Sequence, residues 1–280
     1  MARTDAMSIL TSGATADKLA ELDGQLIENV QKDALSTSIK NVNYSGDPTT
    51  GSVEINRFKN AESADYGTAR TAGAGNKLKN TGKVTINIDT DKEIVEEIAN
   101  KDLQLFGVAG LADRRTANHS KRVAAALDRA FFATAEAAAT EVEIDTDANI
   151  EDAVEAVIQT VETVNNDWVD GVNREDLVLT LTPAVYGKLR NYIDKIDGGA
   201  GKEAVEYFHG VRVYSNVRQT KGILCQFQGS VAQPVIINQY AAEKIGLSND
   251  VAIELFYSYG TKAVMPDLIF FAEYGTPVSA

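Results

Sequence analysis

Histidine and cysteine, which often perform catalysis or bind metals, are sparse in this chain of 280 residues. His119 and His209 are its only histidines, and neither has a cysteine or carboxylate at a spacing that resembles a known metal site. Cys225 is the single cysteine, so an intrachain disulfide is excluded and a small, semi-buried apolar role is expected. These residues predict structural roles, and we expect no catalytic residue, cofactor or metal.

Three stretches imitate ligand-binding motifs, and each lacks a residue that its motif requires. Residues 145–149 resemble the start of a calcium loop, but Ile150 and Ala156 stand where a glycine and a bidentate glutamate are needed. Residues 198–202 resemble a phosphate loop without its first glycine and its final serine or threonine. Residues 73–75 lack the third glycine of a dinucleotide-binding turn. We therefore interpret 145–149 as a turn before a helix.

Composition narrows the class of protein further. The chain is 44% hydrophobic, which suffices for one large domain or two modest ones with genuine cores. A signal-like segment and a long uncharged apolar run are both absent from the sequence, so we expect neither secretion nor membrane spanning, and folding in a reducing cytoplasm. The net charge of −13 argues against a protein that reads DNA sequence or grips phosphates.

The stretch from 51 to 89 departs from that acidity. Two alternating segments, 52–58 and 83–88, predict a β-hairpin whose span from 59 to 82 is too long and polar to form its own core. The hairpin is basic, with Glu62 and Asp65 as its only acidic residues between the first and last of these six: Arg57, Lys59, Arg70, Lys77, Lys79 and Lys83. It is either a solvated loop or, as a sharper hypothesis, a positive arm laid across the acidic face of a neighbouring copy.

The remaining elements follow from periodicity. Apolar spacing predicts helices at 15–32, 91–100, 111–139 and from Asn149 to Trp168, and another beginning at Pro183. The helix over 111–139 would be a rod of roughly 43 Å with a charged exposed side. Strands are predicted at 177–181, 211–214, 234–238, 251–257 and 268–273. The central strands and helices predict a compact α/β unit.

This order of parts resembles the major capsid protein of tailed bacteriophages, whose fold is shared with encapsulin shells. The resemblance covers nearly the whole chain. It is carried by the predicted helix at 15–32 and by these local patterns: Val53-Glu54-Ile55 with Asp65-Tyr66, Ala126-Leu127-Asp128-Arg129-Ala130, Leu179-Thr180-Leu181-Thr182-Pro183-Ala184-Val185-Tyr186, Gly210-Val211-Arg212-Val213-Tyr214-Ser215 and Ile269-Phe270-Phe271-Ala272-Glu273-Tyr274.

The resemblance implies an α+β fold of the Hong-Kong-97 type. Residues 1–50 would form an N-terminal arm, 51–90 an extended loop, 91–142 with 248–280 a peripheral domain with a spine helix, and 143–247 an axial domain. Similar proteins assemble as hexamers and pentamers into icosahedral shells. The implied partners are copies of itself, packaged double-stranded DNA held without sequence-specific contacts, and separate scaffold, portal and decoration proteins, in a virion assembled in the host bacterial cytoplasm.

Three hypotheses follow. The first is a viral shell protein, whose basic hairpin residues contact a neighbouring subunit. The second is an encapsulin-like nanocompartment shell, which would hold a cargo enzyme instead of a genome. The third is a soluble α/β enzyme or binding module in which the hairpin acts as a lid.

Overall fold

The computed structural model describes residues 13–61, 65–67, 82–99, 108–145, 147–196, 205–238, 241–246, 248 and 250–274. Its helices are α2 (Gly13–Asp33), α3 (Leu35–Ile39), α6 (Val108–Ala138), α7 (Ile150–Glu162) and α8 (Pro183–Ile196). Its longer strands are β1 (Ser52–Arg57), β2 (Gly82–Asn87), β3 (Thr90–Ile98), β5 (Leu177–Leu181), β7 (Val211–Ser215), β8 (Ile223–Phe227), β10 (Val235–Ile237), β11 (Ala241–Lys244), β12 (Val251–Tyr259) and β14 (Ile269–Ala272). The described residues also form four two-residue strands: β4 (Thr140–Glu141), β6 (Tyr207–Phe208), β9 (Val231–Ala232) and β13 (Lys262–Ala263), the last of which pairs with β9.

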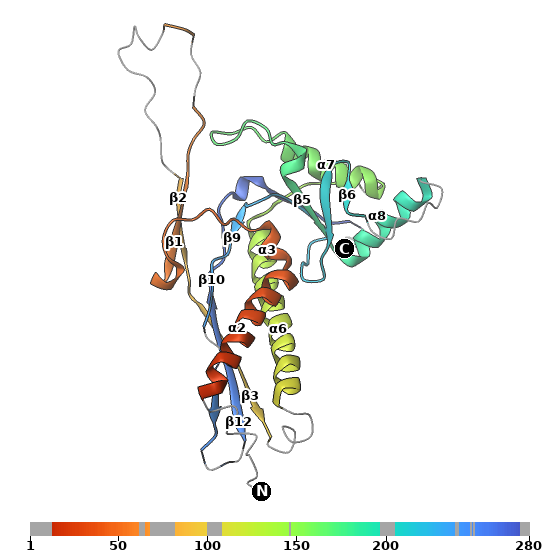
Figure 1. The fold of residues 1–280 in the computed structure, drawn as a ribbon. Helices are drawn as coiled ribbons and strands as arrows, with labels where there is room; N and C mark the ends of the chain where they lie inside the picture. Colours follow the sequence, from red (N-terminus) through yellow and green to blue (C-terminus); the bar gives the residue numbers. More distant parts are fainter. Residues whose placement is uncertain are drawn as a thin grey trace, which may run out of the picture.

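One half of the molecule is elongated. The long helices α2 and α6 run beside each other and cover one face of a sheet in which β12 pairs with β3, β10 and β11 (Figure 1). The apolar stripe predicted for the first helix forms this contact, since Leu26 and Val30 pack with Val123, Leu127 and Leu255. Burial of such stripes supplies most of the stability of helices in water. The two helices and the sheet therefore hold one another in place.

The helix predicted at 91–100 is wrong. Residues 90–98 form β3, which pairs antiparallel with β12 over nine residues, from Thr90 opposite Tyr259 to Ile98 opposite Val251. Ile94 and Ile98 fit a helical period, but they also alternate with Val95 and Glu97, which are exposed. The sequence fits both a helical period and the alternation of a strand. Pairing with the long strand β12 and burial against α6 favour the strand, because such contacts override local propensity.

The other half is a compact α/β unit. Its six-stranded sheet has the order β4-β14-β8-β5-β7-β6, with β5 buried along its whole length between β8 and β7. The predicted helices α7 and α8 pack on this sheet, where Val157, Ile158 and Leu189 join Leu179 in the core. Cys225 lies in β8 and is fully buried, which raises the pKa of its thiol to about 12. The short apolar strand β8 was not predicted from the sequence.

The helix predicted to reach Trp168 ends at Glu162 instead. Asn149 caps its start by accepting a hydrogen bond from the amide of Asp152, so the prediction of a turn before a helix at 145–149 is confirmed. Beyond Thr163 the chain turns back, and Gly171, at φ of +78°, donates from its amide to the carbonyl of Val164. The loop 163–171 therefore leaves the helix face, with Trp168 near its middle.

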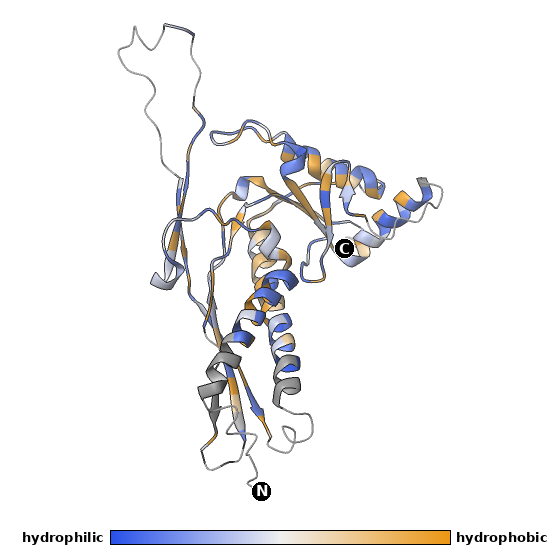
Figure 2. Ribbon diagram, viewed as in Figure 1, coloured by the Kyte–Doolittle hydropathy of each residue, from blue (hydrophilic) through white to orange (hydrophobic). Residues whose placement is uncertain are grey.

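The two halves meet around the end of α6. Phe131 and Phe132 are fully buried there against Ile39 of α3 and Phe271 of β14. Asp128 is also buried, and its carboxylate accepts from the amide of Ser36 at 2.9 Å and from the guanidinium of Arg218 at 2.8 Å. Figure 2 shows hydrophobic residues gathering where α6 passes α3. The carboxylate of Asp128 on α6 thus joins α3 to the loop of the compact unit that contains Arg218.

The expected domain boundaries stay a prediction, and two sets of strands pair outside the sequence range with which the resemblance grouped them. β14, from the range 248–280, belongs to the six-stranded sheet of the compact unit. β10 and β11, from the range 143–247, pair with β12 in the elongated sheet.

Candidate functional site

The hairpin strands β1 and β2 lie at the edge of the elongated half (Figure 1). β1 and β2 pair antiparallel from Ser52 opposite Asn87 to Arg57 opposite Gly82. Val53, Ile55 and Ile86 are buried on one face and pack with Val264. The pairing fixes residues 52–57 against residues 82–87. Contacts around Arg57 and Gly82, the last pair of this ladder, hold that end of the hairpin against the body of the protein.

Arg57 is tied to the body of the protein by an ion pair. Its two terminal guanidinium nitrogens lie 2.5 and 2.7 Å from the two carboxylate oxygens of Asp267. Asn166 donates to the same carboxylate at 2.7 Å. Burial acts to raise the pKa of Asp267, but the hydrogen bonds from Arg57 and Asn166 outweigh it and hold the pKa below its ordinary value. A bidentate pair of this kind fixes direction as well as distance.

Trp168 stacks under the two basic residues at the root of the hairpin. The guanidinium carbon of Arg57 lies 5.1 Å and the ammonium of Lys59 5.5 Å from the centre of the indole ring, within the range of cation–π attraction. Asn166 holds the loop in shape because its side-chain oxygen accepts from the amides of Trp168 and Val169. Loop 163–171 thereby becomes a platform for the hairpin.

Two further contacts complete this platform. Lys59 forms an ion pair with Asp167, and the amide of Asn60 donates to the carbonyl of Asp167 at 2.9 Å. On the second strand, a Cβ at Gly82 would lie 2.7 Å from the Trp168 ring and 2.8 Å from the carbonyl oxygen of Arg57. Only glycine leaves room for this packing. We call Arg57, Lys59, Gly82, Asn166, Asp167, Trp168 and Asp267 the hairpin-base cluster.

The six basic residues singled out from the sequence divide into two groups. Arg57 and Lys59 belong to the hairpin-base cluster, and Lys83 forms a 2.6 Å ion pair with Glu54 across the hairpin. Arg70, Lys77 and Lys79 lie outside the described residues. The structure is of one chain, so contact of any of the six with another subunit stays a prediction.

Sequence reasoning missed the other half of the cluster. Asn166, Asp167 and Trp168 were assigned to a helix, and Asp267 lies about 210 positions from Arg57. The usable signal was the single tryptophan of the chain beside an Asn-Asp pair, because Asn and Asp favour turns.

The two histidines lie in separate polar clusters. His119, buried in α6, has its Nε2 2.9 Å from the Glu96 carboxylate, to which Arg115 is also paired. Burial lowers the pKa of His119, with Arg115 acting in the same direction and Glu96 against it. His209 is half exposed and places Nδ1 3.1 Å from Glu155. Among the described residues, no group of three His, Cys, Asp or Glu side chains is arranged to hold a metal ion.

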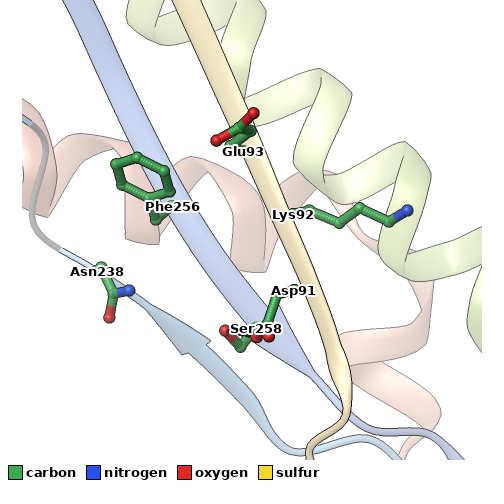
Figure 3. Close-up of a pocket in the computed structure, with 6 residues that line it drawn as sticks. All are labelled: Asp91, Lys92, Glu93, Asn238, Phe256 and Ser258. Carbon is green, nitrogen blue, oxygen red and sulfur yellow. Dashed lines mark hydrogen bonds between the residues drawn. The ribbon is translucent and has the colours of Figure 1, made fainter.

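A second surface lies on the open face of the elongated sheet. Phe256 is 38% exposed there, at one side of an open depression of about 490 Å³. Figure 3 shows the lining residues: Asp91, Lys92, Glu93, Asn238, Phe256 and Ser258. The side chain of Lys92 extends away from Phe256, and Ser258 donates to Asp91 at 2.6 Å. The depression presents the carboxylates of Asp91 and Glu93 beside an aromatic ring.

Comparison with known proteins identifies the architecture. Neither a protein-family model nor a curated protein sequence matches the chain. Among solved structures, the capsid structure of cyanophage P-SCSP1u matches with a TM-score of 0.60 at 14% identity, covering 84% of this chain and 85% of that one. The chain has the fold of phage capsid proteins.

Two further structures share this capsid fold. The capsid of Ralstonia phage GP4 matches with a TM-score of 0.59 at 13% identity, covering 82% of this chain and 85% of the other. A virus-like particle from Pyrococcus furiosus matches with a TM-score of 0.59 at 11% identity, covering 91% and 98%. The expected α+β fold of the Hong-Kong-97 type is therefore confirmed. No described helix of this capsid fold is long and apolar enough to cross a membrane.

Proposed function

We propose that the protein is a major capsid protein that assembles with copies of itself, as hexamers and pentamers, into a closed icosahedral shell around double-stranded DNA. The observation that carries this proposal is the capsid fold over most of the chain. The sequence of the hairpin supports it, because a long polar span from 59 to 82 without a core of its own would gain its contacts from a neighbour. Scaffold, portal and decoration proteins would be separate chains, and assembly would take place in the cytoplasm of a bacterial host.

The hairpin-base cluster gives the arm its role in this proposal. Arg57, Lys59 and Trp168 set the direction in which the hairpin leaves its own subunit. The basic residues farther along, Arg70, Lys77 and Lys79, would then meet an acidic surface of the adjacent subunit. Opposite potentials favour docking in one orientation and disfavour others. A candidate receiving surface is the carboxylate-rimmed depression beside Phe256.

Negative-stain electron microscopy of the purified chain tests the shell function. The expected result is closed particles of uniform diameter. Monomers or small oligomers alone, at high protein concentration and over a range of salt, would contradict it and would favour a soluble enzyme or binding module.

A second candidate is a nanocompartment shell of the same fold. The match to the virus-like particle from Pyrococcus furiosus, which includes 98% of that chain, favours keeping this candidate. The two differ in content: particles purified from the native source contain double-stranded DNA if the shell is viral, and a co-purifying enzyme without a genome if it is a compartment. Nuclease-protected DNA measured after particle disruption separates them.

A further inference from the structure

The exposed face of α6 carries a basic stripe. Its exposed charged side chains among the described residues are all positive: Arg114, Lys121, Arg122 and Arg129. At about 100° per residue these four fall within an arc of about 100°. They lie opposite Val123 and Leu127, which are buried against the sheet. None of the four pairs with a carboxylate of the described chain, whereas the half-buried Arg115 is paired with Glu96.

Unpaired positive charge is unexpected in a chain with 40 acidic and 27 basic residues. The stripe runs from Arg114 to Arg129, a rise of about 22 Å at ~1.5 Å per residue. The exposed Ala117 and the half-buried Ala125 lie between the charges, so a bulky partner can approach the helix closely. A straight, rigid row of this kind suits an extended polyanion better than a single small anion.

The opposite face of the elongated half carries the opposite sign. On the open face of the sheet, Glu93 and Glu97 of β3 are exposed beside Val95. Phe256 lies across from Glu93, and Glu254 across from Val95. Ile94 and Leu255, which alternate with these residues, face α2 and α6. The elongated half is therefore a slab with a basic helix on one side and an acidic sheet on the other.

We propose that the α6 stripe is the surface that contacts the phosphates of packaged double-stranded DNA, so that α6 lines the inside of the shell and the acidic sheet face points away from it. The inference rests on the proposed shell function. A duplex carries about one negative charge per 1.7 Å of its axis, so about 13 charges accompany a stripe of this length whatever the base sequence. The four basic residues give sequence-independent contact with the phosphates. This contact is weak, because Glu21 and Asp33 are exposed on the adjacent α2 and repel the same phosphates.

The first test measures binding of full-length, unassembled subunits to a mixed-sequence DNA duplex over a series of salt concentrations. The variant is Lys121→Gln with Arg122→Gln and Arg129→Gln. The matched control is Lys188→Gln with Arg190→Gln and Lys195→Gln on α8, which removes three exposed positive charges elsewhere. Here K is the association constant for the duplex, and log K falls as log salt concentration rises. The expected result is that the stripe variant reduces the magnitude of this slope by about 2 to 3, while the control keeps the slope of the unmodified chain.

Equal slopes for the stripe variant and the control overturn the proposal, and a normal slope for the stripe variant would point to an acidic protein segment as the partner.

The second test measures the DNA content of particles. Stripe-variant particles of normal diameter that hold less nuclease-protected DNA support the proposal, and normal DNA content overturns it. Because the subunit assay does not need a shell, loss of slope in a chain that forms no particles would contradict the shell function and leave the phosphate surface in place.

Discussion

At the scale of single residues, Trp168 determines how the hairpin joins the body. It is the only tryptophan of the chain, and Arg57, Lys59 and Gly82 all contact its ring. Its indole fluorescence therefore reports directly on this junction. Changes to its neighbours can be detected by the same signal without any added label.

The first prediction concerns Gly82. In Gly82→Ala, the new methyl group would lie inside contact distance of both Trp168 and the Arg57 carbonyl, so the strand or the ring must move. We expect a loss of about 1 to 3 kcal/mol in the free energy of unfolding and a red-shifted emission of Trp168 in the folded state. Gly187→Ala on α8 is the control, because its Cβ meets nothing within 4 Å. There we expect a gain of up to about 1 kcal/mol and an unchanged emission. Equal effects at the two glycines would contradict the packing.

The second prediction concerns Asp267. Its folded pKa lies below the value of about 3.9 in an unfolded chain, so the unfolded state takes up the proton first on acidification. The stabilisation is therefore fully present above about pH 4 and is lost as pH falls through the folded pKa. Asp267→Asn should cost about 2 kcal/mol at neutral pH, because it leaves Arg57 unpaired.

Denaturant unfolding from pH 7 to pH 3 measures this cost as the difference in the free energy of unfolding between Asp267→Asn and the unmodified chain. That difference should shrink below about pH 4. Asp194→Asn, which removes an exposed partner of Arg190 at 3.9 Å, should cost little at any pH. A difference for Asp267→Asn that is constant down to pH 3 would exclude the ionised pair as its source.

At the scale of elements, periodicity predicted the long amphipathic helices better than the elements whose identity depends on a distant partner. The helices at 15–32 and 111–139 are confirmed with shifted ends, because each has a long apolar stripe. β3 was mistaken for a helix because its identity depends on β12, more than 150 residues later. The same limit explains the hairpin-base cluster: Arg57 was found as a basic residue, but its partner Asp267 could be found only from the fold.

The third prediction concerns the hairpin as an element. Replacing residues 62–80 by a short Gly-Ser linker keeps Arg57, Lys59, Asn60 and Gly82, and with them every described contact of the hairpin base. We expect unchanged Trp168 emission and unfolding free energy, but no normal particles. Circular dichroism and fluorescence check the fold, and electron microscopy checks assembly. Normal particles from the shortened chain would contradict the arm hypothesis, and loss of folding would place the replaced segment in the core.

At the scale of the whole molecule, the distribution of charge matters more than its sum. The chain is acidic overall, yet its positive groups are concentrated in the hairpin and along α6. The acidic Glu93 and Glu97 are exposed on the open sheet face. Copies of such a molecule repel one another except where faces of opposite sign meet.

The fourth prediction tests this balance in assembly. Lys77→Glu with Lys79→Glu should raise the protein concentration needed for particle formation, most strongly at low salt, because exposed charges are screened within about 8 to 10 Å near physiological ionic strength. Light scattering during assembly measures this concentration. Lys188→Glu with Lys195→Glu gives the same change in net charge on α8 and should shift assembly less. Equal shifts at all salt concentrations would assign the effect to net charge alone.

The long pairing of β3 with β12 also sets the order in which the chain can be completed. β3 leaves the ribosome more than 150 residues ahead of its partner strand, and Ser36 of α3 and Asp128 must likewise wait for Arg218. Pairings this distant in sequence form late and slowly. The elongated half and its two charged faces are therefore finished only after β12 has been synthesised. A nascent chain that still lacks β12 offers its neighbours neither face, so the proposed assembly would use subunits whose β12 is already paired.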